Sequence, residues 1–148
     1  MKRKAVGKSF VTVAFLLAFL AALPAARADE RNQETKVAFS QSVQISGHVL
    51  PAGTYLFVLP NDIAQHDIVS IFSPDHRKLY ATVLTAYVER SQPTAGTAFT
   101  LAERGSALPE AIVTWFYPGR TVGHEFLYAK TVQKELAKDP RTTIVAGY

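Results

Sequence analysis

Apolar and polar residues alternate between residues 36 and 46, and short apolar runs bounded by turn residues follow along the rest of the chain; both patterns predict β-strands. Between residues 36 and 46 the apolar side chains share one parity, and polar side chains take most of the other. A period of two is typical of a strand that buries one face. Further strand-like runs, separated by turns rich in Gly, Pro and Asp, cover residues 54–59, 67–72, 78–89, 97–102, 110–117 and 124–128.

One later segment has helical spacing instead. Val132 and Leu136 stand four residues apart among lysines, and Pro140 follows, which predicts a short helix over residues 131–138. About seven short strands with frequent turns predict an all-β domain, either an antiparallel β-sandwich or a small barrel, with this one C-terminal helix. Residues 141–148 either add a final strand or form a tail.

The first 28 residues have the pattern of a cleavable signal peptide. A basic start precedes an apolar run at 11–23, and Ala26-Arg27-Ala28 places small residues at the −3 and −1 positions. The apolar run is shorter than the about 20 residues that a membrane-spanning helix needs. Cleavage between Ala28 and Asp29 is therefore favoured over an uncleaved anchor. We expect export through the general secretory route, a periplasmic or extracellular location, and no stable membrane span after processing.

The predicted organisation follows from these patterns. It comprises a signal peptide at 1–28, a flexible segment at 29–35, a β-sandwich domain at 36–130, and a short helix with a C-terminal tail at 131–148. The part that remains after cleavage is close to the commonest domain size, which is enough for one hydrophobic core.

Cleavage also changes the charge of the protein. The whole chain has 16 basic and 12 acidic residues and a net charge of +4. Five of the 16 basic residues and none of the 12 acidic ones precede Asp29, which leaves 11 against 12 and a net charge of −1. The remaining basic residues are scattered singly, which argues against a nucleic-acid partner. The absence of cysteine excludes thiol catalysis, thiolate metal sites and disulfides.

Candidate chemistry is sparse. The chain lacks the common nucleophile, phosphate-loop, zinc-protease and calcium-loop motifs. His66 and His76 flank a predicted strand and so lie roughly 25–30 Å apart, too far to share a metal ion. We interpret all four histidines, at 48, 66, 76 and 124, as solvated turn residues, and we expect neither a metal nor a cofactor. Glu110 and Glu125 are the candidates for a glycosidase-type carboxylate pair, although a surface ion pair at a strand edge is favoured.

The most distinctive segments are WFYPG at 115–119 and GHEFLY at 123–128. Because side chains alternate along a strand, Trp115 and Tyr117 are expected to share one face. Two interpretations are open. The aromatics form part of the core, which is favoured for Trp115, or they form an exposed platform that stacks a sugar or peptide. The candidate ligand-binding residues are Trp115, Tyr117, Glu125 and Tyr128.

Three segments carry a resemblance. LPAGTY at 50–55, WFYPG at 115–119 and the G-x-E-F-x-Y pattern at 123–128 together resemble a group of short exported bacterial β-domain proteins of unknown function. The likeness covers roughly residues 37–130, although Ala129 stands where the group has proline. The resemblance implies export and one compact domain, and it transfers no catalytic residue.

The sequence therefore predicts an exported, non-enzymatic β-domain that binds a ligand or serves as a structural component of the cell envelope. Its partner is an unidentified ligand or envelope component. Two alternatives stay open: a carbohydrate-binding module that uses the aromatic platform, and a hydrolase with Glu125 as the acid or base.

Overall fold

The computed structural model describes residues 33–60 and 67–146. The predicted signal peptide, its cleavage site at Ala28 and Asp29, and His66 lie outside the described residues. Within them the chain forms ten strands and one short helix, so the mostly-β composition is confirmed, although about seven strands were expected. None of the helical structure in these ranges is long and apolar enough to cross a membrane.

The first half of the sheet is an antiparallel meander. It contains, in spatial order, β1 (Gln33–Phe39), β4 (Gly53–Leu59), β5 (Ile68–Phe72) and the first part of β6 (Leu79–Glu89). β1 begins at Gln33, so residues 33–35, which were expected to lie in the flexible segment, belong to a strand.

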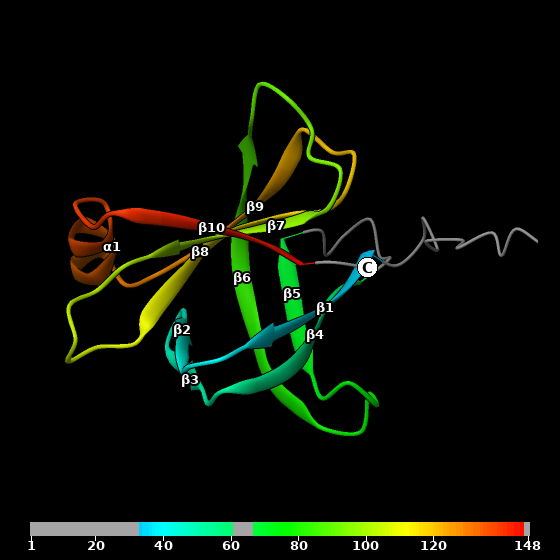
Figure 1. Ribbon diagram of the computed structural model, residues 1–148, viewed down its shortest axis with the longest axis horizontal. Coiled ribbons are helices and arrows are strands. Elements are labelled where there is room, and N and C mark those ends of the chain that lie inside the picture. The colour runs from blue at the N-terminus through cyan, green and yellow to red at the C-terminus, as the bar shows by residue number, and fades with distance from the viewer. Residues whose placement is uncertain (1–32, 61–66, 147–148) are drawn as a thin grey trace, which may run out of the picture.

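The second half of the sheet continues from the far end of β6. Its strands are β9 (Val122–Phe126), β8 (Glu110–Phe116), β7 (Thr97–Ala102) and β10 (Arg141–Ala146), each antiparallel to the next. β6 belongs to both halves because its early residues pair with β5 and its later residues pair with β9. This long, bent strand therefore joins the two halves (Figure 1).

Three small elements complete the fold. The hairpin of β2 (Val43–Ile45) and β3 (His48–Leu50) attaches to β8 through a parallel pairing of β2. The helix α1 (Lys130–Leu136) confirms the predicted helix, and its Leu136 packs on Ala102 and Ala111. The C-terminal segment is thus part of the domain, since α1 packs on the sheet and β10 extends it.

The extra strands have a simple origin. The single strand expected over residues 36–46 is divided into β1 and β2, β3 forms inside the expected turn, and β10 takes up the C-terminal segment. Phe39 and Val43 share one parity, so periodicity did not reveal the break between the two strands. The polar residues Ser40, Gln41 and Ser42 form that break.

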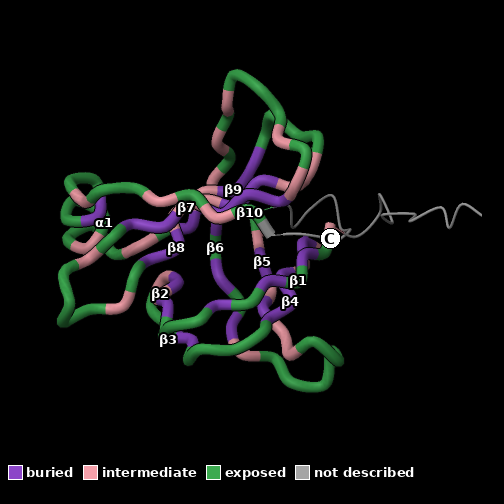
Figure 2. The backbone as a smooth tube through the Cα atoms, viewed as in Figure 1, coloured by how far each residue is buried: buried purple, intermediate pink, exposed green. Residues whose placement is uncertain are grey.

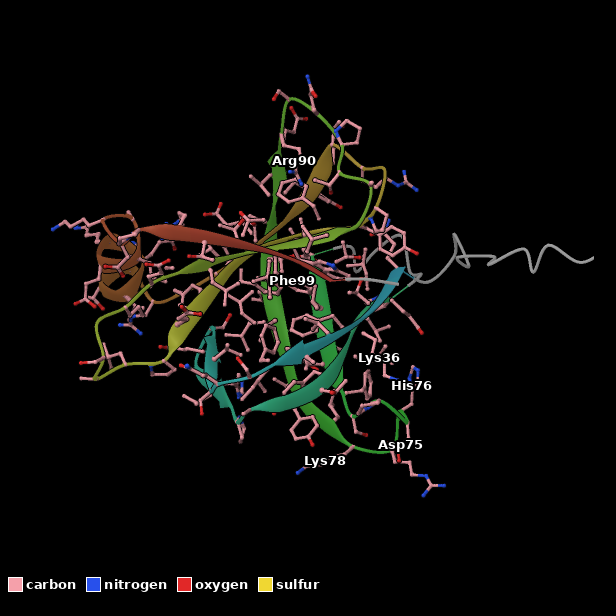
Figure 3. All side chains as sticks on the ribbon, viewed as in Figure 1. Lys36, Asp75, His76, Lys78, Arg90 and Phe99 are labelled. Carbon is pink, nitrogen blue, oxygen red and sulfur yellow. The ribbon has the colours of Figure 1, made fainter. Side chains whose placement is uncertain are left out.

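The inner faces of both halves enclose one large apolar cluster (Figure 2). At its centre, the Phe57 ring centroid lies 5.0 Å from Phe99, 6.1 Å from Trp115 and 6.3 Å from Phe126. Each fully buried side chain of this size contributes about 1.5–3 kcal/mol. Figure 3 shows Phe99 in this interior, with labelled charged residues such as Lys78 and Arg90 toward the periphery. Packing of these rings holds together a domain that has no disulfide.

The expected sandwich or barrel is not established by these pairings. A sandwich consists of two separate sheets, whereas here every strand belongs to one connected sheet. A closed barrel requires its two edge strands to pair, and within residues 33–60 and 67–146 no hydrogen-bonded ladder joins β1 to β10. The structure shows an open sheet of mixed pairing.

Candidate functional site

Trp115 belongs to the core and does not form a binding surface. Its side chain is fully buried, stacked on Phe99 with ring centroids 6.1 Å apart and an interplanar angle of 5°. Its indole Nε1–H has no hydrogen-bond partner among the described residues. Since a buried ring cannot stack a ligand, the core interpretation is confirmed and the exposed platform is wrong for this residue.

A β-bulge in β8 explains how two inward residues come to be three positions apart. Thr100 of β7 pairs with Thr114, but its neighbour Leu101 pairs with Ile112, so β8 has one extra residue at this point. A bulge shifts the alternation of faces. As a result Ile112 and Trp115 both enter the large apolar cluster.

The two candidate tyrosines brace the fold. Tyr117 is half-buried and packs against the apolar cluster. The Tyr128 hydroxyl lies 2.7 Å from the Ile112 carbonyl oxygen and 3.1 Å from that of Gln44, and it can donate to either. Burial raises the pKa of Tyr128 well above its ordinary value. With Trp115 inside, these tyrosines do not form the predicted three-ring platform.

The two candidate carboxylates lie on opposite faces of the sheet. Glu125 alternates in β9 with His124 and Phe126, whose side chains are buried, and therefore lies on the outer face. Glu110 begins β8 and lines a pocket between the inner residues of β1, β7 and β10. A glycosidase needs its two carboxyl groups to face each other about 5–10 Å apart across the sugar. This arrangement is not formed.

The histidines have different environments. His48 is exposed, and the exposed His76 lies 3.7 Å from the Glu34 carboxylate. His124 is buried, with Nδ1 3.2 Å from Thr85 Oγ1 and its ring 5.8 Å from Trp115. The solvated-turn interpretation is thus wrong for His124, because β9 starts two residues before it. In the described ranges no three potential metal ligands come together.

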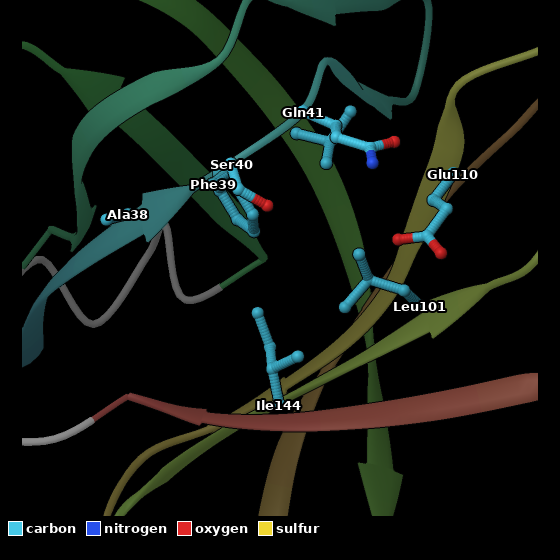
Figure 4. Close-up of a pocket in the computed structure, with 8 residues that line it drawn as sticks. Ala38, Phe39, Ser40, Gln41, Leu101, Glu110 and Ile144 are labelled. Carbon is cyan, nitrogen blue, oxygen red and sulfur yellow. The ribbon is translucent and has the colours of Figure 1, made fainter.

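A pocket of about 250 Å³ lies where the edge strands β1 and β10 diverge, and we name it the seam pocket (Figure 4). Its walls are Ala38, Phe39, Ser40, Gln41, Val43, Leu101, Glu110 and Ile144. Sequence reasoning missed it because its residues come from five strands and one connection, separated by up to about a hundred positions.

The shape of the seam follows from the two ends of β1. At one end, the Thr35 and Thr97 hydroxyl oxygens are 3.1 Å apart and buried, and Thr97 pairs with Ala146 of β10. β1 and β10 are also in contact with each other. At the other end, the chain after Phe39 departs to form β2, which pairs with β8. The seam therefore opens toward the β2 end.

The pocket combines an apolar floor with a polar rim. Phe39, Val43, Leu101 and Ile144 supply the floor, whereas Ser40, Gln41 and Glu110 supply hydroxyl, amide and carboxylate groups. Apolar walls with a few polar groups are the usual composition of a binding site. An apolar group fits the floor, and an N–H donor or a cation fits the Glu110 carboxylate. The lining contains no histidine or lysine to activate the Ser40 hydroxyl as a nucleophile.

The comparisons with known proteins add no relative to this picture. No protein-family model, curated protein or solved structure matches the chain.

Proposed function

We propose that the protein is an exported, non-enzymatic binding domain whose ligand site is the seam pocket. The observation that carries this proposal is the pocket itself, a recess between two sheet edges that is lined by apolar side chains together with a hydroxyl, an amide and a carboxylate. The lining offers groups that bind and orient a ligand but no activated nucleophile.

In this proposal the sheet acts as a small β-barrel that is open along one seam. Three features support this geometry: β1 is linked to β10 through the successive pairings of β4, β5, β6, β9, β8 and β7, both halves enclose the same core, and β1 contacts β10. The buried rings then provide a rigid frame, and the seam is the place where a ligand can approach the inner face.

The carbohydrate-binding module and the hydrolase each need an arrangement of residues that the structure does not form. A carbohydrate-binding platform requires exposed rings, and Trp115 is fully buried. A hydrolase based on Glu125 requires a second group opposite it, and Glu110 lies on the other face of the sheet. The export part of the proposal rests on the signal-peptide pattern of residues 1–28.

Fragment screening by NMR tests the proposed site. Ligands from a mixed library of small amphiphiles and short peptides should shift the backbone amide signals of residues 38–43, Leu101, Glu110 and Ile144 together. Ile144→Phe fills the pocket and should weaken such binding about tenfold or more, which corresponds to about 1.4 kcal/mol. Val145→Phe is the matched control, because Val145 is the next residue of β10 and is 61% exposed. Equal effects of the two variants would contradict the proposed site.

A further inference from the structure

We infer that the occupant of the seam pocket is a short extended segment of a partner polypeptide, which joins the sheet along β10 and carries an apolar anchor and a basic residue. This inference rests on the proposed function of the same pocket and names the class of its ligand.

The first support is the pairing of the two edges. Among the described residues, β10 forms a ladder only with β7, and β1 only with β4. No other backbone hydrogen bond in these ranges involves residues 33–41 or 141–146. An unpaired edge presents a row of N–H and C=O groups that is a template for another strand. Addition of a peptide strand to such an edge is a common mode of recognition.

The second support is the alternation of side chains along β10. Ile144 faces the pocket, whereas Val145 faces solvent on the other side. A strand laid against β10 follows the same pleat, so its alternate side chains are directed into the pocket and away from it. The pocket volume of about 250 Å³ is below the range of about 300–1,000 Å³ that is usual for drug-sized ligands. It is therefore large enough to receive an apolar side chain of a peptide together with part of its backbone.

The third support is the charge of the rim. Figure 4 shows Gln41 on the connection after β1 and Glu110 on β8, and Glu110 brings the negative charge to the lining. A peptide that places leucine or a similar residue in the floor can present a lysine or arginine to this carboxylate. Because β1 and β10 are in contact, the seam is not open along its whole length, so only a few residues of the peptide can pair with β10.

A library of capped hexapeptides, with each position randomised in turn, tests this inference on the protein beginning at Asp29. We expect selection of an apolar residue at one position and of lysine or arginine at another. Binding of the best peptide should slow hydrogen exchange of backbone amides within residues 141–144. The same peptide with alternate N-methylated amides keeps its side chains but loses its backbone donors, and it should bind about tenfold more weakly.

Two glutamine variants test the charge. Glu110→Gln should reduce the preference for a basic residue over a neutral one about fivefold or more, in line with a charge-assisted hydrogen bond. Glu125→Gln removes an identical charge from the opposite face of the same sheet and should leave the preference unchanged. Loss of the preference in both variants, or in neither, would overturn the assignment of the basic residue to Glu110.

The outcomes separate this inference from the proposed function. If the N-methylated peptide binds as tightly as the unmodified one, strand addition is wrong. Strand addition is also wrong if no peptide is selected and hexylamine binds in the pocket without slowing hydrogen exchange of the β10 amides. In either case the seam pocket remains a small-molecule site. If neither the peptide library nor the amphiphiles shift the signals of the pocket residues, the proposed function fails together with the inference.

Discussion

Trp115 illustrates how far one residue depends on its neighbours. The ring stacks on Phe99, meets Phe57 edge-on, and lies beside the buried His124. Its Nε1–H gains no hydrogen bond among the described residues, so its contribution comes from packing and apolar burial.

Replacement of Trp115 by alanine should therefore lower the free energy of unfolding by about 3–5 kcal/mol, the usual range for truncating a buried large aromatic. Trp115→Phe should cost less, because it keeps a ring and removes the unpaired N–H donor. Urea denaturation of both variants gives these differences. Since Trp115 is the only tryptophan, native emission should be blue-shifted and move to longer wavelength on unfolding. Red-shifted native emission with unchanged stability of Trp115→Ala would contradict its burial.

Gly123 is a position where the absence of a side chain is required. A Cβ atom there would lie 2.6 Å from Phe116 Cδ1 and 2.7 Å from the Trp115 carbonyl oxygen. Because a backbone oxygen cannot move aside cheaply, Gly123→Ala should destabilise the protein by about 1–3 kcal/mol. The matched control is Gly105→Ala, whose new Cβ meets nothing within 4 Å. Thermal melting compares the stabilities of the two variants. Equal melting temperatures would contradict the prediction, because they would mean that β8 and β9 can move apart at little cost.

At the scale of elements, the β2–β3 hairpin is held by polar contacts around Gln44. Tyr128 and the Arg104 guanidinium both bond to Gln44, and Arg104 also lies 3.6 Å from the Glu135 carboxylate of α1. The Ser46 hydroxyl donates to the Leu127 carbonyl at 2.8 Å. These contacts place β2 beside β8, and Val43 of β2 is part of the pocket floor.

The Tyr128 hydroxyl gives this hairpin a dependence on alkaline pH. Burial raises the pKa of Tyr128 above its ordinary value of 10.0, so the folded state favours the neutral hydroxyl. Its contribution to stability is complete below pH 10 and is lost as the pH rises above that value. The wild type should therefore lose stability more steeply than Tyr128→Phe above pH 10, as measured by urea denaturation at a series of pH values. Parallel curves would contradict a role for this hydroxyl.

At the scale of the whole molecule, the distance between β1 and the β7–β10 pair determines how nearly the sheet closes into a barrel. Cysteines at positions 35 and 97 should form a disulfide on oxidation, because the two hydroxyl oxygens they replace are 3.1 Å apart. The chain has no other cysteine to compete. Closing a loop of this length stabilises a protein by up to about 4 kcal/mol relative to its reduced form. As a control, the pair Thr35→Cys and Thr100→Cys should not form a disulfide, since Thr100 lies on the outer face of β7. Thiol titration and mass measurement show which of the two double variants has lost its free thiols.

Processing is the second property of the whole chain that a measurement can establish. Intact mass of the protein recovered from cells should correspond to a chain beginning at Asp29, because Ala26 and Ala28 provide the small residues that signal peptidase requires. Ala28→Tyr should block cleavage and retain the precursor. A wild-type mass that includes residues 1–28 in a membrane fraction would contradict export as a cleaved protein.

The sequence by itself determined the properties that are encoded locally. Short apolar runs bounded by turn residues placed the strands at 54–59, 97–102 and 110–116 closely, and helical spacing located α1, because these signals depend on residues that are neighbours along the chain. The burial of Trp115 also followed from the size and apolarity of its ring.

Only the tertiary structure decided how those elements are combined. The bulge in β8 depends on two residues opposing one on another strand, and the division of β6 between two partners depends on where β5 and β9 lie. The burial of His124, the separation of Glu110 from Glu125 across the sheet, and the seam pocket all follow from those pairings. Strand pairing is set by contacts between distant parts of the chain, and a local periodicity carries no record of which distant strand lies beside it.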